Sequence, residues 1–79
     1  MDDAPDDRLN LARVDAELTM AELWMRYFGL GGMSAAVELE ACLYGALTTT
    51  DHNYDMIAHA LNERFVELGR NHPVPYATE

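Results

Sequence analysis

Lysine is absent from this sequence of 79 residues, and its only strongly basic residues are five arginines. They face fourteen acidic residues, so the formal net charge is −9. Nucleic acids and anionic lipid surfaces attract proteins chiefly through Lys and Arg. The charge therefore predicts that neither nucleic acid nor a membrane surface is a partner, and it favours a basic protein instead.

Cysteine is nearly absent as well. The single Cys42 allows no intramolecular disulfide and no cysteine-based zinc site, on which small secreted domains often depend. The acidic start, Met1–Asp7, lacks the basic and apolar regions of a signal peptide. No apolar run approaches the roughly 18 residues that a membrane helix needs. The sequence predicts a cytoplasmic protein with no membrane span.

The chain is long enough for one domain, and its apolar residues recur at helical rather than strand spacing. The predicted fold is all-α, a small bundle of three helices, or four if residues 9–18 form their own, with an extended proline-containing strap at the C-terminus. Residues 1–8 are predicted to be a disordered acidic leader and residues 9–79 a single domain. The helices are expected at about 9–18, 19–28, 34–45 and 52–68.

The first helical segment has two readings. No glycine or proline interrupts residues 9–28, and one apolar stripe runs along them, formed by Leu11, Val14, Leu18, Ala21, Met25 and Phe28. A capping box at Thr19 and Glu22 marks a helix start inside the same segment. One long helix and two shorter helices both fit, and residues 19–28 are the better defined.

The remaining boundaries follow from glycine, proline and capping residues. The glycine-rich turn 29–32 ends the second helix, and Ser34 is the expected N-cap of the next. Asp51 is the expected N-cap of the last helix. Two prolines exclude a helix near residues 73–75, and Val74 or Tyr76 is expected to fold back onto the core.

A cluster of aromatic and methionine side chains is the candidate partner site. Trp24, Tyr27, Phe28 and Met33 are typical of both a small core and a protein-binding groove. As a site, they would form the apolar anchor. The acidic rim would consist of Glu38, Glu40, Glu63 and Glu67. The partner would be a basic protein or, alternatively, a second copy of the chain.

A second candidate site lies on the last predicted helix. His52, Asp55, His59 and Glu63 follow one another at steps of three, four and four residues, so they share a helix face. Imidazole and carboxylate groups are ligands for zinc or iron. The same face lies opposite the apolar stripe of that helix, and a solvent-exposed face is the favoured explanation. Metal or small-ligand binding is therefore an alternative function, and no cofactor is predicted.

Catalysis and DNA binding have weaker support. Ser34, Cys42 and Thr48–Thr50 are the available nucleophiles, and no base is clearly paired with any of them, so a non-enzymatic protein is predicted. Two helices joined by a glycine turn suggest a helix-turn-helix, which makes DNA binding a third hypothesis. Glu38 and Glu40 on a candidate recognition helix would repel phosphates.

Three segments resemble a family of small hypothetical proteins from high-GC Gram-positive bacteria. They are ELWMRYFGLGG at residues 22–32, HALNERFVELG at residues 59–69 and HPVPY at residues 72–76. The likeness spans about residues 20–77. It implies a self-contained helical domain of bacterial origin and brings no activity or binding residues with it. The leading hypothesis is thus a non-enzymatic protein-interaction or regulatory module.

Overall fold

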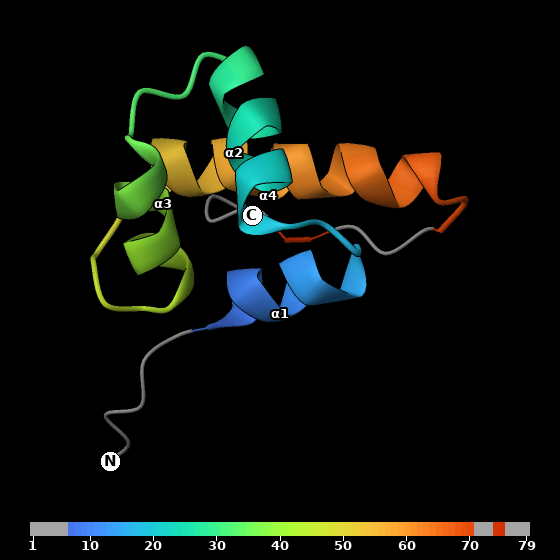
Figure 1. Cartoon of the computed structure of the whole chain (residues 1–79), viewed down its shortest axis with the longest axis horizontal. Helices are drawn as coiled ribbons and strands as arrows, with labels where there is room; N and C mark the ends of the chain where they lie inside the picture. The colour runs from blue at the N-terminus through green and yellow to red at the C-terminus, as the bar shows by residue number, and fades with distance from the viewer. Residues whose placement is uncertain (1–6, 71–73, 76–79) are drawn as a thin grey trace.

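The computed structural model describes residues 7–70 and 74–75, and over these it is all-helical (Figure 1). Its four helices are α1 (Arg8–Asp15), α2 (Met20–Gly29), α3 (Ala36–Leu43) and α4 (Asp51–Glu67). The predicted all-α bundle is confirmed, in its four-helix form. Over the same residues, no helix is long and apolar enough to cross a membrane.

The longest helix, α4, is the element on which α1 and α2 assemble, while α3 packs against α1 and α2. In Figure 1 it lies horizontally, with α2 crossing it, α1 below and α3 beside its beginning. It contributes buried side chains on two adjoining faces: Ile57, Ala58, Ala60, Leu61 and Phe65. Ile57, Ala58, Leu61 and Phe65 among them repeat at the spacing of one helix face. The largest fully buried side chains of the core come from α2, α3 and α4: Leu23, Tyr27, Leu39, Leu43, Ile57 and Leu61.

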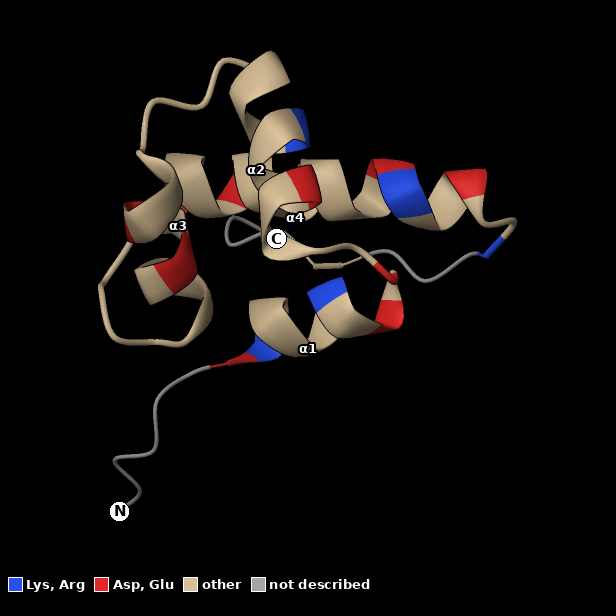
Figure 2. Ribbon diagram, viewed as in Figure 1, with Lys and Arg blue, Asp and Glu red and all other residues tan. Residues whose placement is uncertain are grey.

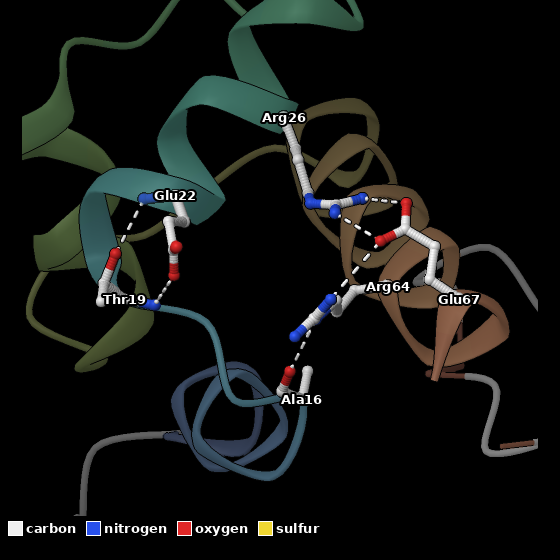
Figure 3. Close-up of polar contacts among 6 residues, drawn as sticks. All are labelled: Ala16, Thr19, Glu22, Arg26, Arg64 and Glu67. Atoms are coloured by element: carbon white, nitrogen blue, oxygen red, sulfur yellow. Dashed lines mark hydrogen bonds and ion pairs between the residues drawn. The ribbon is translucent and has the colours of Figure 1, made fainter. Parts of the chain in front are cut away.

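A sharp turn separates α1 from α2. Glu17 has a positive φ of 60°, and the amide of Leu18 donates to the carbonyl of Arg13 at 3.2 Å. This bond closes a helix in the manner usually supplied by glycine. The capping box then starts α2 as predicted, because Thr19 N donates to Glu22 Oε1 at 2.8 Å and Glu22 N to Thr19 Oγ1 at 3.1 Å (Figure 3).

Because the helix is interrupted, the stripe predicted across residues 9–28 is wrong. Of its six members only Leu18 is buried, whereas Leu11, Val14, Met25 and Phe28 are each more than half exposed. The turn rotates α2 relative to α1, so that each helix has its own inner face. Leu9 and Ala16 are buried at α1 and its end, and Leu23 and Tyr27 in α2.

Several predicted boundaries shift. The first helix covers 8–15 rather than 9–18, so Arg8 belongs to α1 and not to the predicted leader, of which residues 1–6 lie outside the described part. The third covers 36–43 rather than 34–45, and its N-cap position is Ala35 rather than Ser34. The fourth begins after Thr50, whose Oγ1 accepts from Asn53 N at 3.1 Å, so Thr50 and not Asp51 is the N-cap.

The described end of the C-terminal segment folds back onto α4. Asn62 holds the backbone of Val74 on both sides, donating Nδ2 to its carbonyl at 3.2 Å and accepting its amide proton. The Val74 side chain packs against the core, as predicted. Tyr76, the alternative contact, lies outside the described residues.

Candidate interaction surface

Tyr27 belongs to the core, so its predicted place in a partner-binding anchor is wrong. Its side chain is fully buried, and its hydroxyl donates to Asn53 Oδ1 and accepts from Ser34 N at 3.0 Å. Asn53 Nδ2 in turn donates to Thr49 Oγ1 at 2.7 Å. A phenol is stably buried when its hydroxyl is satisfied in this way. These bonds tie α2 to the two loops around α3, and they occupy the Ser34 amide.

The α2–α3 loop can lie against this ring because residue 32 is glycine. A Cβ atom built on Gly32 would lie 2.3 Å from the Tyr27 ring, far inside contact distance. Gly32 is itself buried, while the next residue, Met33, is 95% exposed. Because the loop is held against the Tyr27 ring at Gly32, the position of the exposed Met33 is fixed as well.

Trp24 and Phe28, one helical turn apart on α2, both reach the surface, which decides for these two residues between the core and surface interpretations. Their rings stack with centroids 5.1 Å apart, Phe28 is 58% exposed and Trp24 is half-buried. Trp24 Nε1 donates to the carbonyl of Ser34 at 3.1 Å, which joins this pair to the loop that carries Met33. We call Trp24, Phe28 and Met33 the aromatic strip. It is an apolar surface running from α2 to the beginning of α3.

The four predicted rim acids fall into two groups. Glu38 and Glu40 are exposed on α3, where Glu38 Oε1 accepts from Ala35 N at 2.8 Å. Glu63 and Glu67 lie on α4, and Glu67 is already neutralised within the chain. Arg26 donates two hydrogen bonds to it, at 2.8 and 2.6 Å, and Arg64 Nη1 lies 3.5 Å from Glu67 Oε1 (Figure 3). Glu67 thus joins α2 to α4 and offers little charge to a partner.

Most arginines are occupied in this way. Arg64 Nε donates to the carbonyl of Ala16 at 3.1 Å, Arg13 Nη1 to that of Leu18 at 2.7 Å, and Arg70 Nη1 to that of Asp15 at 2.8 Å. Together with Arg26, these side chains connect α1, α2 and the C-terminal end of α4. The basic groups thus serve the internal packing of one end of the molecule.

No Arg or Lys occurs between residues 27 and 63, although this stretch contains five acids. Figure 2 shows the consequence: acidic residues alone mark α3, whereas arginine and acid lie together at the far end of α4. The end of the molecule built from α3 and the start of α4 is therefore acidic. The aromatic strip borders this end through Met33.

The hydrogen bonds from Arg26 lower the pKa of the Glu67 carboxyl below its ordinary value of 4.5. A carboxyl whose folded pKa is lowered stabilises the fold above the unfolded pKa and loses that contribution as pH falls through the folded pKa. Glu67→Gln should therefore lower the melting temperature at pH 7. The difference in melting temperature between this variant and wild type should shrink as pH falls below 4.5. Glu40→Gln, on an exposed site of α3, is the control and should melt like wild type at pH 7. A gap for Glu67→Gln that persists undiminished at pH 3 would contradict this assignment.

The predicted metal-binding residues do not converge. Within residues 7–70 and 74–75, no group of three or more His, Cys, Asp or Glu side chains lies close enough to hold a metal ion. His59 Nε2 lies 3.6 Å from Glu63 Oε2, and both side chains are about half exposed. His52 is exposed at the start of α4. The arrangement favours the solvent-exposed reading of this helix face.

An open pocket of about 360 Å³ lies at the acidic end, between the α2–α3 loop, α3 and the segment leading into α4. Met33, Leu47 and Met56 line it together with Glu38 and Thr48–Thr50. This pocket could not be predicted from the sequence because its walls come from separate segments. The available signal was the β-branched Thr48–Thr50 run, which is typical of extended backbone and here forms one wall.

Cys42 and His52 also line this pocket, but no hydrogen bond joins them. Cys42 is 9% exposed. A cysteine nucleophile is activated by a base within hydrogen-bonding reach, which this pair lacks.

Comparisons of the chain with protein-family models, curated proteins and solved structures gave no match. The resemblance to hypothetical proteins of Gram-positive bacteria accordingly stays a prediction. The function of the chain is therefore inferred from the geometry of its surface alone.

Proposed function

We propose that this chain is a non-enzymatic cytoplasmic module that binds a basic protein segment through the aromatic strip. The observation that carries the proposal is the stacked Trp24–Phe28 pair, with Phe28 58% exposed, together with Met33, 95% exposed on the loop that Trp24 contacts. Single exposed apolar residues are ordinary, but joined aromatic and methionine side chains are typical of interface centres. The Trp24–Ser34 hydrogen bond makes these residues one surface rather than scattered ones.

Charge supports a basic partner. Met33 of the strip lines one pocket together with Glu38 of α3, on which Glu40 is also exposed, and no arginine of the sequence lies between residues 27 and 63 to balance these acids. An acidic surface accelerates association with a basic partner and disfavours acidic ones. Apolar contact at the strip would supply most of the affinity, because rim charges contribute little by themselves.

The test uses a library of random peptides displayed for binding to the whole chain. Selected peptides should be enriched in Lys or Arg together with apolar residues. Phe28→Ala should weaken their binding at least tenfold, which is the loss expected on truncating an aromatic hot spot of about 1.4 kcal/mol or more. Leu11→Ala is the matched control, since Leu11 on α1 is as exposed as Phe28, at 59% against 58%. It should bind like wild type.

Three outcomes would overturn the proposal. Selected peptides without basic residues would contradict a basic partner, and equal losses for Phe28→Ala and Leu11→Ala would place binding elsewhere. A light-scattering mass of twice the chain that returns to one copy in Phe28→Ala would mean that a second copy covers the strip. Unchanged thermal stability of Phe28→Ala is the folding control, because most of this ring is in solvent already.

A further inference from the structure

The pocket at the acidic end has a lining of one charge sign. Among the described residues, Glu38 is the one acidic side chain that lines it; His52 lines it too, and no Lys or Arg does. One carboxylate oxygen of Glu38 accepts from Ala35 N at 2.8 Å, and the other has no partner among the described residues. Such a carboxylate is able to accept a charge-assisted hydrogen bond from a cation. An anionic ligand would meet the same charge with nothing to balance it.

The rest of the lining suits an aliphatic chain. Met33, Leu47 and Met56 come from three segments and surround the opening with flexible or branched apolar groups. Methionine adapts its shape to a bound group, and long basic side chains bury their methylene stems while leaving the charge near polar atoms. The hydroxyl of Thr48, which is not engaged by other described residues, is a further acceptor.

From this lining we propose that the pocket receives a lysine or arginine side chain of the basic segment, with its charged group at Glu38. The inference rests on the proposed function, since it names how that segment is recognised. Met33 belongs both to the aromatic strip and to the pocket wall, so a segment lying on the strip reaches the pocket directly. The volume of about 360 Å³ lies at the lower end of the roughly 300–1,000 Å³ typical of small-ligand sites.

The pocket is tested separately from the strip with small probes. The isotopically labelled whole chain is titrated with N-acetyl-lysine methylamide or N-acetyl-arginine methylamide, and uncharged N-acetyl-norleucine methylamide is the matched probe. Saturable shifts of the NMR signals of Met33, Met56 and Thr48 are expected with a basic probe. The norleucine probe should bind about fivefold more weakly, which is the upper range for an exposed ion pair.

Two variants on α3 make the test specific. Glu38→Gln should reduce the affinity for the basic probes about fivefold and leave the norleucine probe unaffected. Glutamine preserves the hydrogen bond to Ala35 N, because Gln serves at this capping position as well as Glu. Glu40→Gln removes the same charge from the same helix outside the pocket lining and should bind like wild type.

Salt provides a readout that needs no variant. Raising the salt concentration to 0.5 M should weaken the basic probes and leave the norleucine probe unchanged. Equal binding of all probes, no shifts in the pocket, or equal effects of Glu38→Gln and Glu40→Gln would overturn the proposal. Phe28→Ala should retain probe binding while losing the selected peptides. A failure of the strip and a failure of the pocket are therefore distinguishable.

Discussion

Gly32→Ala is expected to destabilise this protein by about 3 kcal/mol or more, at or above the upper end of ordinary overpacking penalties. The added Cβ would lie 2.3 Å from the Tyr27 ring, which is fully buried and has its hydroxyl bonded to Asn53 and Ser34. The ring has no free direction in which to move, so the loop must lift away. The free energy of unfolding from urea titration measures the loss.

Gly29→Ala is the matched control for that substitution. Gly29 is the last residue of the same helix, and no atom would lie within 4 Å of its added Cβ. Alanine there reduces the entropy of the unfolded chain and should stabilise the fold by about 0.4–1 kcal/mol. Opposite signs for two glycine substitutions three residues apart are expected. A loss of less than about 1 kcal/mol for Gly32→Ala would contradict the close approach of loop and ring.

The parts of the fold that could be predicted are those specified by local pattern. The inner face of α4 follows from an apolar period unbroken over its length, and the Thr19–Glu22 capping box marks the start of α2. These signals depend on neighbours within one helical turn. The acidic character of α3 needs only the sequence, because no arginine lies nearby along the chain.

The capping box predicts where α2 begins, but the end of α1 has no signal in the sequence, since Glu17 adopts a conformation that is normally marked by glycine. The apolar stripe predicted over residues 9–28 is wrong because it assumes one continuous helix across this turn. Similarly, the helix N-caps moved by one residue at Ser34 and Asp51. Ser34 has its amide bonded to Tyr27 and so does not start α3. A tertiary contact thus accompanies the shift at Ser34, whereas the Thr50 cap is a local bond to Asn53 N.

The candidate site, like the fold, could be predicted only where local pattern specifies it. Exposed Phe28 and buried Tyr27 are adjacent aromatic residues, and only the packing of α2 against α3 and α4 distinguishes them. Glu67 was predicted as a rim charge, yet Arg26, 41 residues away, holds it with two hydrogen bonds. A partner far along the chain leaves no spacing signal in the sequence. The pocket beside α3 was missed for the same reason.

Tyr27→Phe is the second substitution with a large expected effect. It keeps the buried ring and removes only the hydroxyl, which leaves Asn53 Oδ1 and Ser34 N without that partner inside a packed region. Unsatisfied buried polar groups cost about 1–3 kcal/mol each, so a loss of about 2–3 kcal/mol is expected. At about 4–8 °C per kcal/mol for a domain of this size, the melting temperature should fall by about 10–20 °C.

Tyr54→Phe is the control for the lost hydroxyl. Tyr54 is half-buried and its side chain packs against the core. Its hydroxyl has no hydrogen-bond partner among the described residues. Its removal should change the free energy of unfolding by less than about 0.5 kcal/mol. Because the Tyr27 hydroxyl also fixes the loop that carries Met33, Tyr27→Phe should weaken peptide binding at temperatures where the variant is still folded. Equal stability of the two tyrosine variants would show that the Tyr27 hydroxyl does not hold this loop.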